Sequence, residues 1–307
     1  MGLSDLQRRI LELRDERKAI LLVHNYQIPE IQEIADYLGD SLQLCRQAQR
    51  VKDAKLIVFC GVDFMAETAA ILNPDKKVII PSLEACCPMA AMLPLSRLRE
   101  AKERRPGAPV VLYVNTLAEA KAEATVICTS ANADKIVAGL DAEKVIFGPD
   151  RNLAYYVEKR VPEVELVVVP EDGYCSVHRL LGNGDEAMEL KKLHPGAEVW
   201  AHPECEPEFQ DRADYVLSTG GMTRRAVESD AETFIVGTEQ GLIDRLRNEH
   251  PHKTFLPVKK YAECAAMKRI DLNNLYEALL KEQYVVTVPE DTAEKARRAI
   301  ERMLQMS

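Results

Sequence analysis

Three cysteines lie at nearly equal spacing along this chain and could hold a metal together. They are Cys87, Cys175 and Cys264, separated by 88 and 89 residues. Three thiolates suit a zinc site with one open position, or an iron–sulfur cluster in which one iron lacks a protein ligand. Either metal would act as a Lewis acid on a carbonyl, carboxylate or hydroxyl. The alternatives are three buried cysteines copied together, or Cys86 as ligand in place of Cys87.

A second set of polar side chains follows the same period, in pairs that straddle one residue. The pairs are His24 with Tyr26, Tyr113 with Asn115, and His202 with Glu204. Because alternate residues of a strand share a face, both members of a pair should leave a strand end together. Such strand ends bind ligands in open α/β sheets, and these residue types transfer protons or bind anions. A lone strand-end histidine is commonly structural, whereas six polar groups in register predict a shared site.

Three hydroxyls form a third set, each at the end of a repeated segment. Residues 35–41, 124–130 and 213–219 align without a gap and end at Ser41, Ser130 and Thr219. A hydroxyl at the start of a helix is either an N-cap or a group that helps the helix N-terminus to bind an anion. The spacing favours neither role over the other.

Short β-branched runs alternate with amphipathic stretches, which predicts βα units and parallel sheets. The expected strands are residues 20–24, 56–60, 78–80, 110–114, 145–147, 164–169, 198–201, 214–217, 233–236 and 254–256. The expected helices include residues 150–160, 184–193 and 239–248. Asp63, Asp150 and Glu239 open helices, where their charge favourably meets the helix dipole. An extra strand at 284–288 and an extra helix at 292–303 are expected to complete the first or the last domain.

A repeat of 89 residues is too long for a solenoid unit and suits a small α/β domain. Turn signals near Pro106-Gly107 and His194-Pro195-Gly196 divide the chain. We expect domains at 1–107 with an N-terminal helix, 108–196, and 197–307 with the strand-helix extension. Each would be a three-layer α/β/α domain with a small parallel sheet. A pseudo-threefold axis between the domains would bring the three sets of residues together.

Composition excludes several classes of protein. The chain has 307 residues, 47% of them hydrophobic, and a net charge of −9, so it is globular and lacks the basic face that nucleic acid requires. No apolar run approaches the roughly 20 residues of a membrane span, and the N-terminal stretch is charged rather than signal-like. Eight cysteines without a CxxC pair indicate metal ligands, catalytic thiols or packed side chains rather than disulfides. We therefore expect a cytoplasmic protein.

Short motifs in a fixed order carry a resemblance to a known family. They are His24-Asn25-Tyr26, Gly39-Asp40-Ser41, Cys87-Pro88-Met89-Ala90, Tyr113-Val114-Asn115-Thr116, Thr129-Ser130-Ala131-Asn132, Cys175-Ser176-Val177-His178, His202-Pro203-Glu204-Cys205, Ser218-Thr219 and Cys264-Ala265-Ala266-Met267. Each motif alone is weakly specific. Together, over about residues 20 to 270, they resemble the quinolinate synthase family.

The resemblance implies a [4Fe-4S] cluster bound by Cys87, Cys175 and Cys264, with the fourth iron facing the active site. The implied reaction condenses iminoaspartate with dihydroxyacetone phosphate and releases phosphate and water, giving quinolinate for NAD biosynthesis. Because iminoaspartate hydrolyses readily, a transient contact with the enzyme that produces it is compatible with this reaction. Neither a nucleic acid nor a membrane partner is implied.

The resemblance also suggests roles for single residues. Glu204 and Tyr26 are candidates for proton transfer, and Tyr113 and Asn115 would orient the intermediate. The groups expected to hold carboxylates and phosphate are Ser41, Ser130, Thr219, His24 and His202. The catalytic candidates are Tyr26, Glu204, Tyr113, His24 and His202. His178, three residues after Cys175, would either hydrogen-bond close to the cluster or simply pack, and the first of these is favoured.

Other kinds of protein remain compatible with parts of this pattern. Another [4Fe-4S] hydro-lyase, acting on a small hydroxy acid, would use the same open iron without needing to bind phosphate. A non-enzymatic iron–sulfur or zinc redox sensor would need a surface for a partner or nucleic acid, and the acidic chain offers no basic stripe. A metal-free binding protein of triplicated fold would be colourless and indifferent to oxygen.

Overall fold

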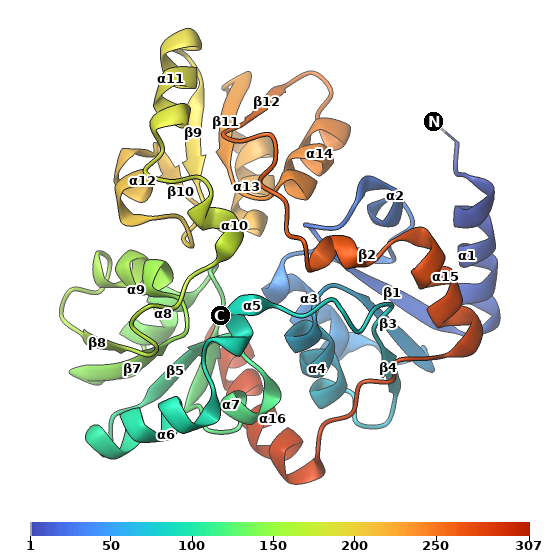
Figure 1. Ribbon diagram of the computed structural model, residues 1–307, viewed down its shortest axis with the longest axis horizontal. Helices are drawn as coiled ribbons and strands as arrows, with labels where there is room; N and C mark the ends of the chain where they lie inside the picture. Colours follow the sequence, from blue (N-terminus) through green and yellow to red (C-terminus); the bar gives the residue numbers. More distant parts are fainter. Residues whose placement is uncertain (1) are drawn as a thin grey trace.

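The computed structural model describes residues 2–307 and contains three similar repeat units around a common centre (Figure 1). Each unit has its own four-stranded sheet, and every strand pair within a sheet is parallel. The strand orders are β2-β1-β3-β4, β6-β5-β7-β8 and β10-β9-β11-β12. The same order in three successive units confirms the expected α/β class with three small parallel sheets.

The first unit begins with a capped helix and places its first strand inside the sheet. Its strands are β1 (Ala19–His24), β2 (Tyr37–Gly39), β3 (Leu56–Cys60) and β4 (Lys77–Ile79). Its helices are α1 (Asp5–Glu16), α2 (Pro29–Gln32), α3 (Ser41–Arg50), α4 (Asp63–Leu72) and α5 (Pro88–Ala91). β3 is buried along its whole length, as expected for an apolar strand with helices on both faces of its sheet.

The second unit repeats this order. Its strands are β5 (Val110–Tyr113), β6 (Val126–Cys128), β7 (Lys144–Gly148) and β8 (Glu165–Val168). Its helices are α6 (Leu95–Arg104), α7 (Ala118–Lys121), α8 (Ala133–Ala138), α9 (Arg151–Glu158) and α10 (Ser176–Arg179). The strands and the helix at 150–160 expected for this unit are therefore present, with ends that differ by a few residues.

The third unit follows the same plan. Its strands are β9 (Glu198–Ala201), β10 (Tyr215–Val216), β11 (Thr233–Gly237) and β12 (Thr254–Pro257). Its helices are α11 (Asp185–Leu193), α12 (Pro207–Arg212), α13 (Thr219–Glu228), α14 (Gln240–Glu249) and the 3-10 helix η1 (Met267–Arg269). Within residues 2–307, no helix combines the length and the apolar character that crossing a membrane requires.

The C-terminal extension binds the first two units rather than the third. The strand expected at 284–288 is wrong, because this segment forms only one bridge, between Val285 and Ile79. Helix α15 (Leu272–Lys281) packs on α1, and α16 (Glu290–Gln305) packs on β6, α7 and α4. Its buried residues are Ala296, Ala299, Ile300 and Met303. The hydrophobic core accordingly runs through the first two units and this extension, whereas the third unit has two separate apolar clusters.

Polar side chains close the boundaries between units. Gln32, on α2 of the first unit, donates from Nε2 to the carbonyl of Gly241 in the third unit (3.0 Å) and to that of Gln27 in its own loop (2.8 Å). Gln210, on α12, donates in the same way to the carbonyl of Asn152 in the second unit (3.0 Å). We call these side chains interunit latches. Both glutamines are buried, so each latch satisfies backbone groups that water does not reach.

The third latch is a lysine at the equivalent position of the second unit. Lys121 is fully buried, and its Nζ donates to the carbonyls of Phe64 in the first unit (3.4 Å) and of Thr116. The latches therefore join the first unit to the third, the second to the first, and the third to the second.

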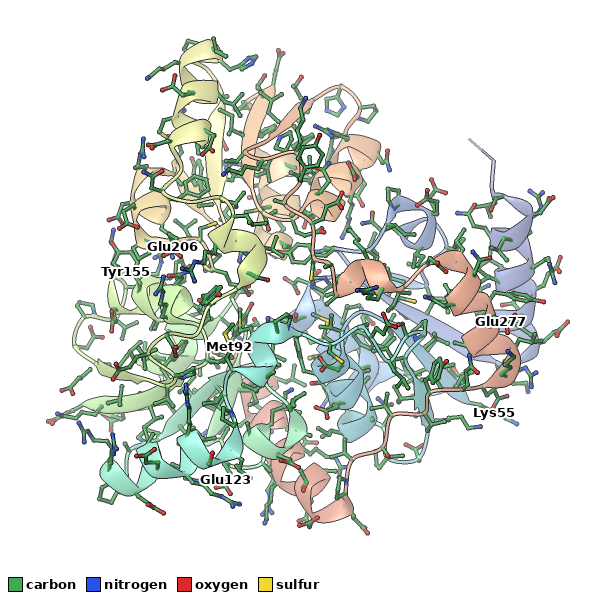
Figure 2. All side chains as sticks on the ribbon, in the orientation of Figure 1. Lys55, Met92, Glu123, Tyr155, Glu206 and Glu277 are labelled. Atoms are coloured by element: carbon green, nitrogen blue, oxygen red, sulfur yellow. The ribbon has the colours of Figure 1, made fainter. Side chains whose placement is uncertain are left out.

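The boundary between the second and third units also carries contacts at the surface. Arg151 forms an ion pair with Glu206 (2.9 Å), and the Tyr155 hydroxyl donates to Asp211 (2.7 Å). Figure 2 labels Glu206 and Tyr155, one from each of these two contacts. These exposed contacts add little stability compared with the buried latches.

Candidate active site

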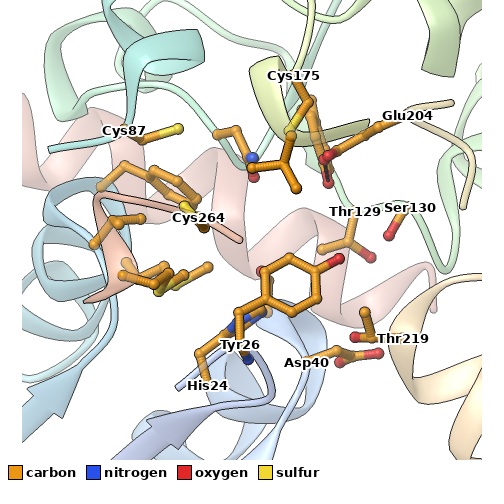
Figure 3. A pocket seen from close by; sticks show the side chains of 18 of the residues that line it. His24, Tyr26, Asp40, Cys87, Thr129, Ser130, Cys175, Glu204, Thr219 and Cys264 are labelled. Atoms are coloured by element: carbon orange, nitrogen blue, oxygen red, sulfur yellow. Dashed lines mark hydrogen bonds between the residues drawn. The ribbon is translucent and has the colours of Figure 1, made fainter. Parts of the chain in front are cut away.

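The three units meet at one central cavity, into which the loops after β1, β5 and β9 project. The cavity has about 620 Å³ of space between its walls, part of it open to solvent. All the site residues expected from the sequence line it: His24, Tyr26, Ser41, Cys87, Tyr113, Asn115, Ser130, Cys175, His202, Glu204, Thr219 and Cys264. Figure 3 shows Cys87, Cys175 and Cys264 at one end of the site, with Thr219 at the other.

The two strand-end histidines are held in the same way. Nδ1 of His24 accepts a hydrogen bond from the backbone N–H of Tyr26 (3.2 Å), and Nδ1 of His202 accepts one from that of Glu204 (3.2 Å). Burial lowers the pKa of both rings to about 3, so both are neutral near pH 7. A neutral ring that accepts at Nδ1 carries its proton on Nε2. We therefore assign each histidine as a hydrogen-bond donor through Nε2. A neutral donor of this kind is suited to binding an anionic ligand rather than to general acid catalysis.

A chain of close polar contacts joins two tyrosines through three other side chains. The hydroxyls of Tyr26 and Thr238 are 2.8 Å apart, and Thr238 Oγ1 is 2.9 Å from Nε2 of His178. Nδ1 of His178 lies 2.7 Å from Oε2 of Glu204, although the ring does not aim an N–H straight at that oxygen. The Tyr113 hydroxyl donates to Oε1 of Glu204 (2.5 Å). The five side chains come from all three units, so the chain exists only in the assembled fold.

The charges in this chain are unevenly distributed. Burial alone would raise the pKa of Glu204, but the His178 and His202 rings and the Tyr113 hydroxyl lower it below its usual range. Burial and the Glu204 charge raise the pKa of Tyr26 and of Tyr113 well above 10.0. The site thus holds one carboxylate between two neutral phenols. A proton can leave either phenol only if a ligand or metal stabilises the phenolate.

The sequence analysis placed His178 near the expected cluster and did not identify Thr238 at all. His178 is fully buried and links Thr238 to Glu204, and one of its ring nitrogens also lies within 4.8 Å of the Cys175 sulfur. Thr238 follows β11 directly, at the position where polar groups follow β1, β5 and β9. Its place after a strand was a usable signal, although its partners could not be read from spacing.

The three hydroxyls do not cap helices. The N-cap of α3 is Asp40 and that of α13 is Ser218, and both side chains accept the capping hydrogen bond. Ser41 and Thr219 are instead the first residues of these helices, and Ser130 lies before the N-cap of α8. The capping alternative is therefore wrong for all three. Their hydroxyls line the cavity at helix N-termini.

The three thiols line the same cavity and contact no other side chain by hydrogen bonding within residues 2–307. Cys87, Cys175 and Cys264 each stand just before α5, α10 or η1, and none of them donates a hydrogen bond from sulfur to any group in residues 2–307. Burial raises the pKa of all three, and Cys264 raises that of Cys87 and Cys175 further. Cys86 is exposed, and its thiol donates to the carbonyl of Leu83 (3.2 Å). The geometry therefore favours Cys87 over Cys86 as a ligand.

Comparison with known proteins identifies the family. A family model described as quinolinate synthetase A protein matches residues 8–305. The chain belongs to the quinolinate synthetase A family. It is 55% identical over 303 residues to the quinolinate synthase of Pyrococcus horikoshii, and 54% identical over 305 residues to that of Methanothermobacter thermautotrophicus, each covering 99% of both chains. The quinolinate synthase of Thermodesulfovibrio yellowstonii is 50% identical over 297 residues, or 97% of both chains. The resemblance seen in the motifs is confirmed, and the chain is an enzyme of the quinolinate synthetase A family.

Two sets of donor atoms in this family member could hold a metal. In one set, donor atoms of Cys175, His178 and Glu204 all lie within 4.8 Å of one another. Two of these three residues, however, already contact each other and the neighbouring hydroxyls of Thr238 and Tyr113. The other set, the three thiols, is free of such contacts and consists only of soft sulfur donors. These thiols become thiolates only where a positive charge stabilises the anion. Iron ions provide such a charge, and soft sulfur donors are the ligands of iron–sulfur clusters.

Proposed function

We propose that this enzyme condenses iminoaspartate with dihydroxyacetone phosphate to form quinolinate, with release of phosphate and water. The observation that carries this proposal is one cavity lined by three thiols and by a chain of acid–base side chains drawn from all three units. The names of the quinolinate synthases that match nearly the whole chain support it. A condensation followed by dehydrations needs repeated proton transfers and a site for anions, and the cavity offers groups for both.

We further propose that Cys87, Cys175 and Cys264 hold a [4Fe-4S] cluster. When bound by three thiolates, such a cluster leaves one iron open and supplies a Lewis acid beside the substrate. The protein groups then bind and orient the substrate next to that position. The buried Oδ1 of Asn115, which has no hydrogen-bond partner within residues 2–307, is available to accept a proton donor of the ligand.

Proton transfer is assigned to Tyr26 and Glu204. Tyr26 faces the cavity, and close contacts through Thr238 and His178 join it to the Glu204 carboxylate, which receives its proton once the His178 ring turns its Nδ1 toward Oε2. Tyr113 donates to the other oxygen of this carboxylate and therefore tunes its basicity and fixes its orientation. This division gives Tyr26 the role of base or acid at the substrate, and Glu204 the role of proton store.

Anion binding is assigned to hydroxyls at helix starts and to two histidines that lie beside the proton-transfer chain. Ser41 and Thr219 begin α3 and α13, whose N-termini carry partial positive charge. Ser130 adds a third hydroxyl, and the Nε2–H groups of His24 and His202 add two neutral donors. Neutral donors bind carboxylate and phosphate without competing as acids.

Anaerobic purification with iron and sulfide analysis, followed by assay with both substrates, tests the proposal. We expect about four iron and four sulfide ions per chain, as a [4Fe-4S] cluster requires. Cys87→Ala should abolish the cluster, whereas its exposed neighbour in Cys86→Ala should leave it intact. Iron-free protein after reconstitution would refute the cluster. One zinc per chain that is lost in Cys87→Ala would assign zinc to the three thiols, and one that is retained would favour the site at Cys175, His178 and Glu204. A cluster without quinolinate formation would favour a hydro-lyase or a sensor.

Glu204→Gln tests the assigned proton store. The amide keeps the shape of the side chain and can still accept from Tyr113, but it removes the charge that accepts the proton. We expect full cluster content and a loss of turnover of about 10²-fold or more. Unchanged turnover would remove Glu204 from the mechanism while leaving the proposed cluster untouched.

A further inference from the structure

Each unit has a carboxylate at the start of the helix behind its cysteine loop. These residues are Asp63 at α4, Asp150 before α9 and Glu239 before α14. A favourable interaction with the helix dipole explains acidic residues at such positions in general. It does not explain which group each carboxylate contacts.

Two of these carboxylates accept a hydrogen bond from the backbone of an expected cluster ligand. Oδ1 of Asp63 accepts from the N–H of Cys87 (3.0 Å), and Oε1 of Glu239 accepts from the N–H of Cys264 (2.9 Å). In both cases the acid and the cysteine belong to the same unit. Each contact is a charge-assisted hydrogen bond to a loop that otherwise has little regular structure.

The third carboxylate lies beside the remaining cysteine. Burial and the Glu204 charge raise the pKa of Asp150 well above its usual range, and nearby backbone N–H groups, including that of Cys175, lower it. Asp150 is fully buried and caps α9, while its Oδ2 has no hydrogen-bond partner within residues 2–307. The second unit therefore has the same arrangement in a looser form.

A backbone contact accompanies each carboxylate. The helix start donates to the carbonyl two residues before the cysteine, from Asp63 to Ala85 (2.8 Å) in the first unit. The equivalent bonds run from Arg151 to Gly173 (2.9 Å) and from Gln240 to Ala262 (2.9 Å). The cysteine loops of the first and third units are thus fastened to the start of a helix at two points, and that of the second unit at one.

The first unit shows that the contact with cysteine matters more than capping. In α9 and α14 the acid is the N-cap residue, but the N-cap of α4 is Val62, which cannot accept a hydrogen bond through its side chain. The carboxylate appears one residue later, as Asp63, and still reaches the N–H of Cys87. Capping alone would place the acid at position 62.

We propose that Asp63, Asp150 and Glu239 are positioning residues that hold the cysteine loops ready for the cluster, and that Asp63 and Glu239 also place negative charge beside it. This inference rests on the cluster assigned under the proposed function. A backbone N–H that donates to a carboxylate cannot donate to a cluster sulfur, and both the missing hydrogen bond and the added charge disfavour reduction of the cluster. A cluster that is difficult to reduce stays in one oxidation state, which suits a cluster that acts as a Lewis acid rather than as an electron carrier. Lys268 offsets the charge of Glu239 at 2.9 Å, so Asp63 should have the larger effect on the potential.

Two substitutions at Asp63 separate position from charge. Asp63→Asn keeps an oxygen that accepts the Cys87 N–H but removes the charge, whereas Asp63→Ala removes both. In cluster-free protein, hydrogen exchange at the Cys87 amide should be about tenfold faster in Asp63→Ala, given the strength of a hydrogen bond to a charged group, and nearly unchanged in Asp63→Asn. Asp53→Asn, at an exposed position before the amino end of β3, is the matched control.

The cluster-loaded proteins provide the second measurement. We expect Asp63→Asn to keep its iron and sulfide and to show a more positive reduction potential than the wild-type protein and Asp53→Asn. Asp63→Ala should lose part of its iron and sulfide. Equal exchange rates in all cluster-free proteins would refute the positioning role, and equal potentials would refute the charge effect. If the wild-type chain binds no cluster, the proposed function and the charge effect fail, whereas the exchange rates still decide whether Asp63 positions the loop.

Discussion

Replacing the buried Lys121 by glutamine should change how the stability of this protein depends on pH. The equivalent latches in the other two units are the neutral side chains Gln32 and Gln210, which donate to backbone carbonyls in the same way. Lys121 performs this task with a full charge at a site that is closed to solvent. Lys121→Gln therefore keeps donors at this position while it removes the buried charge.

The magnitude follows from the environment of the ammonium group. Burial lowers the pKa of Lys121 from 10.5 to about 8, with partial compensation by the charge of Glu67. This difference corresponds to roughly 3 kcal/mol at about 1.4 kcal/mol per pKa unit. Because the pKa is lower in the folded state, the unfolded chain binds more protons between pH 8 and 10.5. The buried charge of Lys121 therefore lowers the free energy of unfolding most below pH 8, and this penalty shrinks as the pH rises toward 10.5.

Denaturant unfolding of the wild-type and variant proteins from pH 7 to pH 10 measures this effect. Relative to Lys121→Gln, the wild-type protein should gain roughly 2 to 3 kcal/mol over that range. Lys121→Met also lacks an ionisable group, so its stability should change with pH as that of Lys121→Gln does. It should, however, be about 2 kcal/mol less stable than Lys121→Gln. The reason is that methionine leaves the carbonyls of Phe64 and Thr116 without a donor. Lys52→Gln, at an exposed position, should track the wild-type protein throughout.

Two results would contradict this reasoning. Parallel stability curves for the wild-type protein and Lys121→Gln would show that the buried ammonium carries no penalty at neutral pH. Equal stabilities of Lys121→Gln and Lys121→Met would show that the donors at this position do not close the boundary between units. In that case the equivalence of Lys121 with Gln32 and Gln210 would be a matter of sequence only.

Two further predictions concern the cavity. Thr238→Val should reduce turnover by about 10²-fold or more, because Tyr26 and His178 lose the hydroxyl that joins them. Thr238→Ser keeps a hydroxyl and should retain most of the wild-type turnover. Equal turnover in both variants would exclude the hydroxyl from proton transfer. Lowering the pH from 7.5 to 5 should remove about 4 kcal/mol from the free energy of unfolding through His24 and His202. Both histidines take up protons below about pH 6.5 in the unfolded chain. In the folded protein their pKa values are about 3, so they do not bind protons in this range. The doubly substituted His24→Gln, His202→Gln protein should lose correspondingly less in denaturant unfolding, and an unchanged slope would contradict the assignment.

Spacing predicted the cavity well because the units are copies. Residues at equivalent positions after equivalent strands must lie at equivalent places around the centre. This holds for Cys87, Cys175 and Cys264, which all line the same cavity. The sequence period therefore predicted that these residues lie together, although the conformations of the loops that carry them were not known. The three parallel sheets followed from the same reasoning, since each copy carries the same order of apolar runs.

Local register and long-range contacts were beyond this reasoning. Asp40 and Ser41 are both good N-caps, as are Ser218 and Thr219, so the sequence does not say which residue of each pair begins the helix. The chain through Thr238 depends on side chains from all three units that touch only after assembly. The segment at 284–288 is apolar enough for a strand, but it meets its neighbour at one residue pair only.

The copies have diverged most where side chains face the cavity and least where they hold the backbone. The latch positions keep a donor in every unit, and the cysteine loops are fastened to a helix start in every unit. The positions of Tyr26, Asn115 and Glu204 are equivalent in sequence, yet they hold a phenol, an amide and a carboxylate. A strictly symmetric site could not keep one carboxylate charged between two neutral phenols, because three carboxylates at the centre would raise one another's pKa values. Divergence at the second residue of each pair therefore creates the charge difference that proton transfer needs, while the symmetric scaffold holds the three thiols at one end of the cavity.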